Sequence, residues 1–199
     1  LESEIKSLRV IKKLNEESVL DVIPTFLGAH SFPPEYSDNH EGFVDLVCGE
    51  MIPAIASENL AKYCDVFCED GYFTVNQSRR ILETAKEFGI APRLHADEFK
   101  DSGAAELAAE IGAVSADHLM AASEKGIKAM ILSGVIATIL PGTTLFLGMN
   151  KYVDGRKLID SGCDVSLATD FNPGSCTIQS MPLIISLAVL YCGMTIEEA

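Results

Sequence analysis

The chain has 199 residues, of which 48% are hydrophobic, and a formal net charge of -14 at pH 7. Its length fits one ordinary domain or a large part of a (β/α)8 barrel, because complete barrels need about 250 residues. A sequence-independent grip on nucleic acid or on an anionic membrane surface requires clustered Lys and Arg, which this charge disfavours. We therefore expect neither nucleic acid nor a membrane among its partners.

Both ends of the sequence carry helix signals. At the start, four apolar residues recur at near-helical spacing among charges: Leu1, Ile5, Leu8 and Ile11. Near the other end, Thr195 and Glu198 form a capping box, which should open a helix that has only Ala199 left to continue it. We interpret the chain as an internal segment of a longer protein, so the lack of a visible signal peptide carries little weight.

The six cysteines form no CxxC pair and no regular framework. A chain this hydrophobic needs no covalent staples, and disulfides are rare in reducing compartments. We predict buried, reduced thiols in a cytoplasmic protein. Cys64 and Cys68 are expected to share a strand face, and their spacing is not that of zinc-binding pairs.

Helix-like and strand-like runs alternate along the chain, which is typical of repeated βα units and a parallel sheet. The expected strands are residues 18–30, 63–69, 91–97, 114–119, 135–140 and 163–169. The expected helices after the opening one are residues 42–61, 74–89, 102–112, 124–133, 154–162 and 181–192. An open doubly wound sheet is the alternative, but no glycine-rich phosphate fingerprint follows the first strand.

Single residues refine these elements. Pro53 should kink or split its helix, Gly89 should stop the helix before it, and Ser102 should cap the next one. The apolar run 181–192 is too short to span a membrane and predicts a buried helix. Residues 143–152 predict a long, partly apolar loop of the kind that often forms a lid.

The stretch from Val165 to Ser175 predicts a short strand that ends in a carboxylate. Apolar Val165 and Leu167 alternate with small residues, as in a barrel strand between helices and a crowded interior. Asp170 follows at the carboxyl end, where barrels carry their chemistry, although Asp is also a common turn residue. The next four residues, 172–175, predict a type II turn with backbone N–H groups available to a ligand.

Three of the four histidines, His30, His95 and His118, come at the ends of expected strands, whereas His40 falls in a polar loop. A single histidine is more often structural than functional. In one parallel barrel, however, these imidazoles and Asp170 would all lie at the carboxyl-terminal end of the strands. Imidazoles with a carboxylate suit zinc or ferrous iron, and an open coordination position would lower the pKa of water toward neutrality.

Three motifs together resemble a known family. They are Thr25-Phe26-Leu27-Gly28-Ala29-His30, Arg93-Leu94-His95-Ala96-Asp97-Glu98-Phe99 and Asp170-Phe171-Asn172-Pro173-Gly174-Ser175, with Asp117-His118 between the last two. The chain resembles the imidazolonepropionase family of the amidohydrolase superfamily along nearly its whole length. The resemblance implies that residues 1–199 are part of one catalytic (β/α)8 barrel, roughly its strands 3 to 8, truncated at both ends.

The resemblance implies that His95 and Asp170 bind a metal. The family's other two ligands, a His-x-His on an earlier strand, do not occur in this sequence, which fits truncation. Dinuclear members of the superfamily often have a bridging lysine where this chain has Cys68-Glu69-Asp70. A single divalent ion, zinc or iron, is therefore expected.

The resemblance also implies a reaction, hydrolysis of the ring C–N bond of 4-imidazolone-5-propanoate to N-formimino-L-glutamate in histidine breakdown. Asp170 would take a proton from the attacking water, and His118 would stabilise the charge that develops on oxygen. Glu98 would bond the ring nitrogen or shuttle a proton to it; on the sequence alone a solvated loop carboxylate fits equally well. The implied substrate contacts are His30, Glu98, Asn172, Gly174 and Ser175.

Two other functions stay open from the sequence. Another amidohydrolase, such as a cytosine or guanine deaminase, would share the activation of water but expel ammonia. A catalytically silent barrel used for binding or assembly belongs to a different class, and a missing upstream His-x-His would favour it. The oligomeric state is open, with a homodimer as one candidate. We expect the 199-residue segment alone to be inactive.

Overall fold

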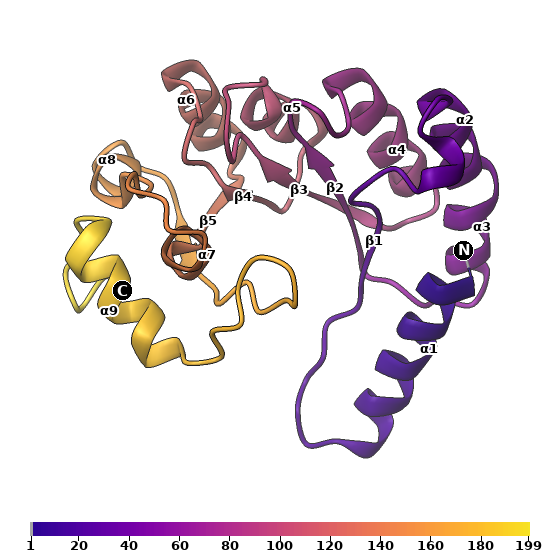
Figure 1. Cartoon of the computed structure of the whole chain (residues 1–199), viewed down its shortest axis with the longest axis horizontal. Coiled ribbons are helices and arrows are strands. Elements are labelled where there is room, and N and C mark those ends of the chain that lie inside the picture. The colour runs from indigo at the N-terminus through magenta and orange to yellow at the C-terminus, as the bar shows by residue number, and fades with distance from the viewer. Residues whose placement is uncertain (1) are drawn as a thin grey trace. The chain divides into compact units, whose positions relative to one another are not determined.

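The computed structural model describes residues 2–199 (Figure 1). Their contacts divide into two compact units, one up to His95 and one from Ala96 onward. In each unit parallel strands alternate with helices, which confirms the expected α/β class. The expected place of Leu1 in the first helix lies outside the described residues.

The first unit holds the strands β1 (Thr25–Ala29), β2 (Tyr63–Cys68) and nearly all of β3 (Ala91–Ala96), in that order across the sheet. β1 and β2 run parallel, with Phe26 opposite Cys64. The prediction that β1 begins at residue 18 is wrong. Asn15 of α1 (Glu2–Glu17) makes two hydrogen bonds with the backbone of Val22, which ties the intervening segment to the helix.

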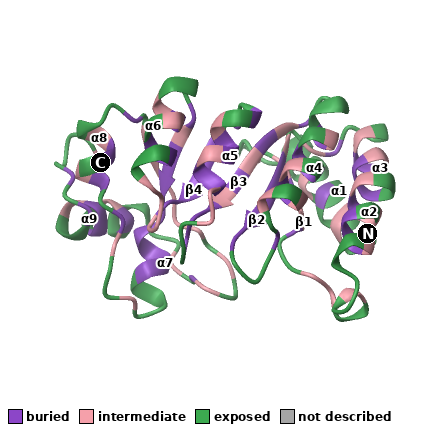
Figure 2. Ribbon diagram, turned by 90° about the horizontal axis from the view of Figure 1, so that it is seen from above, coloured by how far each residue is buried: buried purple, intermediate pink, exposed green. Residues whose placement is uncertain are grey.

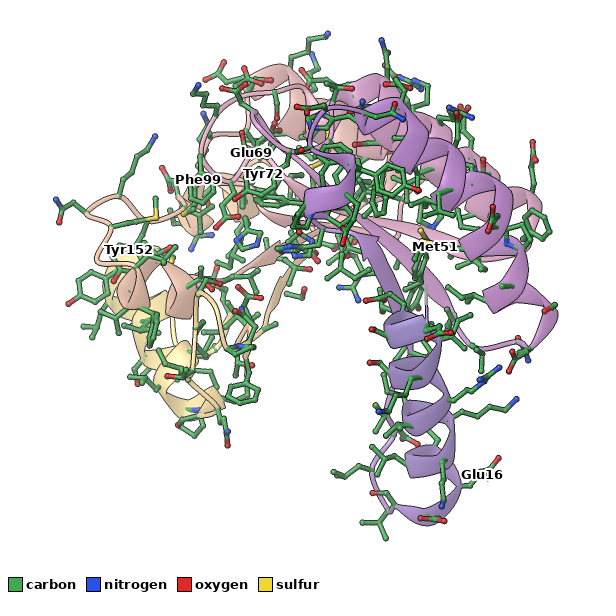
Figure 3. All side chains as sticks on the ribbon, turned by 45° about the vertical axis from the view of Figure 1, so that its right-hand side comes forward. Glu16, Met51, Glu69, Tyr72, Phe99 and Tyr152 are labelled. Carbon is green, nitrogen blue, oxygen red and sulfur yellow. The ribbon has the colours of Figure 1, made fainter. Side chains whose placement is uncertain are left out.

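The helix expected over residues 42–61 is split. It consists of α2 (His40–Leu46), a widened π turn η2 (Val47–Met51) and α3 (Ile52–Ser57). Pro53 has no N–H to donate to the preceding turn, which explains the widening just before it. Met51, labelled in Figure 3, is buried and lies against Gly28 of β1, where an added Cβ would come within 3.0 Å of its methyl group.

Local signals define α4 (Val75–Glu87) at both ends, as expected. Thr74 and Gln77 form a reciprocal capping box before its first turn. Gly89 follows its last turn with a φ of 77°, in the left-handed region. The short helix η1 (Pro34–Tyr36) lies in the loop between β1 and α2.

The second unit holds strands that are neighbours in chain order, with β4 parallel to β5 and β5 parallel to β6. Ala137 of β5 lies opposite Ala116 on one side and Val165 on the other. Its elements are α5 (Ala104–Ile111), β4 (Ser115–His118), α6 (Glu124–Ser133), β5 (Ile136–Ile139), α7 (Pro141–Phe146), α8 (Gly155–Asp160), β6 (Val165–Leu167) and α9 (Met181–Tyr191).

The structure corrects the expectations for α7 and α9. The loop expected over residues 143–152 begins with a helical segment, because Pro141 at the first position starts α7, which runs to Phe146; residues 147–152 are irregular. The apolar helix α9 is buried on one face only: Ile184 and Leu187 are buried, whereas Leu190 is 71% exposed. The capping box of Thr195 and Glu198 is present, with a hydrogen bond in each direction.

Buried residues lie along the strands and on parts of the helices, and exposed residues predominate in the loops (Figure 2). All six cysteines are free thiols; five of them are buried, as expected, and Cys48 is partly exposed. Among residues 2–199, no helix combines the length and apolar character needed to cross a membrane.

Candidate active site

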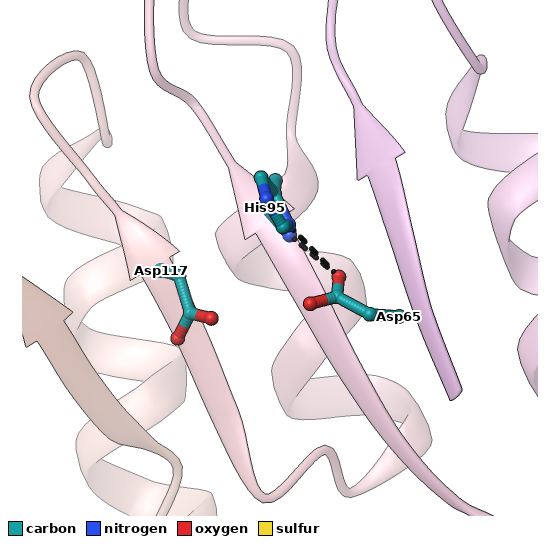
Figure 4. A group of neighbouring side chains, drawn as sticks. All are labelled: Asp65, His95 and Asp117. Atoms are coloured by element: carbon teal, nitrogen blue, oxygen red, sulfur yellow. Dashed lines mark hydrogen bonds and ion pairs between the residues drawn. The ribbon is translucent and has the colours of Figure 1, made fainter. Parts of the chain in front are cut away.

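In the first unit, His95 of β3 faces Asp65 of β2 (Figure 4). The Oδ1 atom of Asp65 lies 3.0 Å from Nδ1 of His95 and accepts a hydrogen bond from its backbone N–H at 3.2 Å. Burial alone would raise the pKa of Asp65, but the His95 imidazole and the charge of Arg93 hold this pKa below its usual range. A carboxylate beside Nδ1 fixes the orientation of the His95 ring.

His30 comes directly after β1 and is exposed. Its ring stacks on Phe67 with centroids 5.2 Å apart, and meets the His95 ring edge-on at 5.8 Å. Phe67 itself lies 5.6 Å from the His95 ring. The structure thus brings two of the predicted imidazoles, from β1 and β3, together around one phenylalanine of β2, the strand between them.

In the second unit, Glu98 and His118 form a buried pair. Nδ1 of His118 lies 3.6 Å from Oε1 of Glu98, a distance that suits an ion pair but is long for a hydrogen bond. Their side chains are only 3% and 6% exposed, for His118 and Glu98 respectively. Glu98 is therefore not a solvated loop carboxylate.

The residues that end these strands have unusual backbone conformations. Asp97, His118, Leu119 and Asp170 all have φ between 49° and 77°, the left-handed region that residues other than glycine rarely adopt. Each such residue costs about 1–3 kcal/mol, and such strain clusters at functional sites. The backbone thus turns sharply where β3, β4 and β6 deliver their polar side chains.

Asp97 organises the start of α5. One carboxylate oxygen accepts from the N–H and hydroxyl of Ser102 and from the N–H of Ala104, and the other accepts from Ala105. The prediction that Ser102 caps this helix is therefore wrong, because Asp97 takes that role. Asp97, Asp101 and Glu106 bring carboxylate oxygens within 4.8 Å of one another, but the donors around Asp97 account for this group as a helix start.

Asp170 follows β6 and is partly buried. Its Oδ2 accepts a hydrogen bond of 2.5 Å from the hydroxyl of Thr143, which belongs to α7. A hydrogen bond to an ionised carboxylate is stronger than one between neutral groups. The helix α7, which forms the first part of the expected loop, therefore orients the predicted base and metal ligand.

The turn after Asp170 is not the expected type II turn, because Gly174 does not have a positive φ. The side chain of Asn172 closes it instead: its Oδ1 accepts from the N–H groups of Gly174 and Ser175, and its Nδ2 donates to the carbonyl of Asp170. The backbone donors expected to be available are thus engaged by Asn172. The substrate contacts of Asn172, Gly174 and Ser175 stay predictions.

Sequence reasoning missed two partners of the candidate residues, Asp65 and Thr143. Asp65 could have been found from the sequence, because a carboxylate in the middle of an apolar strand needs a buried partner. Thr143 could not, because its role depends on the fold of α7 beside Asp170.

Comparison with known proteins gives a consistent result. No family model matches the chain. It is 52% identical to an imidazolonepropionase of Alkaliphilus oremlandii over 198 residues, which is 100% of this chain and 47% of that protein. The imidazolonepropionase of Shouchella clausii is 53% identical over 99% of the chain and 44% of its own length. The chain thus spans about half the length of the curated relatives it matches.

Solved structures share the fold at much lower identity. The guanine deaminase from C. acetobutylicum has a TM-score of 0.70 and 15% identity, and the match covers 94% of this chain and 48% of that one. An adenosine deaminase from Xanthomonas campestris, with bound zinc, has a TM-score of 0.66 and 15% identity over 93% of this chain and 44% of that one. The chain is therefore a homologue of the imidazolonepropionases along its whole length, and it shares the α/β fold of these deaminase structures.

Proposed function

We propose that the protein containing this chain hydrolyses the ring C–N bond of 4-imidazolone-5-propanoate, giving N-formimino-L-glutamate, in the cytoplasm. The observation that carries the proposal is the burial of Glu98 against His118 at the ends of β3 and β4. A buried acid and an imidazole in contact are the groups that proton transfer during ring opening requires. The identity to imidazolonepropionases over the whole chain supports the substrate.

The donor types of the candidate ligands His95 and Asp170 suit one divalent metal ion, zinc or iron. His95 directs Nδ1 toward Asp65, and Asp170 accepts through Oδ2 from Thr143, so both candidate ligands are oriented by a neighbouring side chain. An imidazole nitrogen and a carboxylate oxygen are ligands that both metals accept. A bound divalent ion would lower the pKa of a water molecule toward neutrality.

The residues of the chain divide the remaining work. Asp170 takes a proton from the water that attacks the ring carbonyl carbon, and His118 stabilises the charge that develops on oxygen. Glu98 delivers a proton to the ring nitrogen as the C–N bond breaks. His30 contacts the substrate beside Phe67, and residues 172–175 hold it from the β6 side.

The test is turnover of 4-imidazolone-5-propanoate by the full-length, metal-loaded protein, with the product followed by mass spectrometry. Wild type should form N-formimino-L-glutamate, and Asp170→Asn should lose at least about a thousandfold in kcat, because it removes the base. Asparagine suits this position because it tolerates the left-handed backbone. Metal content of both proteins should be measured by elemental mass spectrometry.

Asp164→Asn is the matched control, since Asp164 is exposed and precedes the same strand. It should turn over like wild type. Guanine and cytosine should be assayed in parallel. Ammonia from either nucleobase without imidazolone turnover would establish a deaminase instead, and a folded, metal-free, inactive protein would support a silent barrel.

A further inference from the structure

Aromatic side chains hold the loop between β1 and α2 against the first unit. Its backbone hydrogen bonds are local: the N–H of Tyr36 donates to Pro33, that of Ser37 to Pro34 and that of Asn39 to Tyr36. These bonds join residues within the loop and give it its local shape. This loop begins immediately after His30, so the contacts that anchor it also determine where His30 lies.

Phe32 provides the anchor. Its ring lies between the imidazole of His40, parallel to it with centroids 3.8 Å apart, and the ring of Phe73 at 4.2 Å. Phe43 of α2 meets the same ring edge-on at 5.9 Å. Phe73 is fully buried, so the stack is fastened to the core of the unit.

The same segment of β2 and its following turn supports both rings of the loop. His30 stacks on Phe67, and two residues later Phe32 stacks on Phe73. These two supports are joined, because the N–H of Phe73 donates to the carbonyl of Phe67. His30 and Phe32 therefore both pack against one continuous segment of the chain, His30 on Phe67 and Phe32 on Phe73.

We propose that Phe32, clamped between His40 and Phe73, is a positioning residue that fixes the imidazole of His30 for substrate binding. This inference rests on the proposed function, in which His30 contacts the substrate. Phe32 itself touches no reacting atom in that scheme. Its loss should allow residue 30 to leave Phe67 while β1 and β2 stay folded.

The experiment uses the full-length protein with histidine-selective 13C labels, and compares wild type with Phe32→Ala. In wild type the ring of Phe67 shifts the His30 resonance, which His30→Gln identifies. Phe32→Ala should lose this shift and raise KM for the imidazolone about tenfold, with kcat within about twofold, as expected when only binding is weakened. Phe32→Tyr keeps the ring and should restore both values.

Two further variants separate positioning from folding. Phe88→Ala removes another phenylalanine of the first unit, one that is 46% exposed, and should change neither readout. His40→Ala removes only the exposed ring that stacks on Phe32. This variant replaces Phe32→Ala if that protein does not fold. We expect a smaller loss of the His30 shift and a smaller rise in KM than for Phe32→Ala.

An unchanged His30 shift and KM in a folded Phe32→Ala protein would overturn the proposal. A wild-type protein that does not open the imidazolone ring would instead refute the proposed function. In that case the His30 resonance still decides whether Phe32 positions the imidazole, because this readout needs no substrate.

Discussion

β2 and β6 are both parallel strands associated with a candidate carboxylate, yet they hold it in different ways. β2 has six residues, all but the first buried, and Asp65 points from within the strand to His95. β6 has three residues, none of them fully buried, and Asp170 lies beyond its end, bonded to Thr143. The packed strand fixes its carboxylate through burial, whereas the short strand relies on a few polar contacts.

The largest expected effect is on the packing of the β2 region. Phe26 of β1 is fully buried opposite Cys64, so Phe26→Ala should lower the free energy of unfolding by about 3–5 kcal/mol. Leu167→Ala in half-buried β6 should cost only about 1–2 kcal/mol. Urea unfolding monitored by circular dichroism measures both. Equal losses would show that the two strands are held alike.

The next effect concerns the polar contacts beyond β6. Thr143→Val removes the hydroxyl that donates to Asp170, and a hydrogen bond to a charged group contributes about 1.5–3 kcal/mol. We expect kcat/KM for the imidazolone to fall by about tenfold or more, since Asp170 loses its orientation. Thr143→Ser keeps the donor and should retain most of the activity. Full activity of the valine variant would remove Thr143 from the site.

The capping box of α4 in the first unit should contribute less to stability. Thr74→Ala removes the side-chain acceptor of the capping box of α4 and should cost about 0.5–2 kcal/mol of stability. Thr74→Ser keeps the acceptor and should stay close to wild type. Thermal unfolding distinguishes them, and an alanine variant as stable as the serine variant would show that packing alone holds the helix.

The smallest effect is a pH dependence in the second unit. Burial, with a contribution from Asp154, raises the pKa of the Cys192 thiol to about 11. The unfolded thiol ionises near pH 9, so the unfolded state binds fewer protons between these values and stability falls as pH rises from about 9 to 11. Cys192→Ala should show a shallower fall in urea titrations over this range. An identical slope would contradict the assignment.

Elements with local signals could be predicted closely from the sequence. The cap at Thr74 and the glycine at position 89 define α4, and Ser123 and Gly134 flank α6 in the same way. Three predictions failed, those for the start of β1, the loop from residue 143 and the turn at residues 172–175. Each depended on a contact or a backbone conformation that the local sequence pattern does not determine. Asn15 reaches Val22, Pro141 starts a helix, and Asn172 closes a turn that its neighbours could have formed another way.

In the candidate site too, positions could be predicted from the sequence, whereas side-chain contacts could not. The strand-end positions of His95, His118 and Asp170 followed from motif and alternation alone. Their orientation did not, because it depends on the partners Asp65, Glu98 and Thr143, which lie 30, 20 and 27 positions away in the sequence. Periodicity indicates which face a residue occupies, but only the fold shows which atom it meets.

The widened turn η2 sets the rotation of α3 about the helix axis relative to α2. Each extra residue rotates the next segment by about 100°, because a helix has about 3.6 residues per turn. Ile52 and Ile55 of α3 are fully buried, so their inward direction depends on that rotation. Gly49, within the turn, is exposed with open space around it. Replacing this glycine should be tolerated, whereas deleting it would rotate both isoleucines toward solvent, so the length of this stretch is constrained more tightly than its composition.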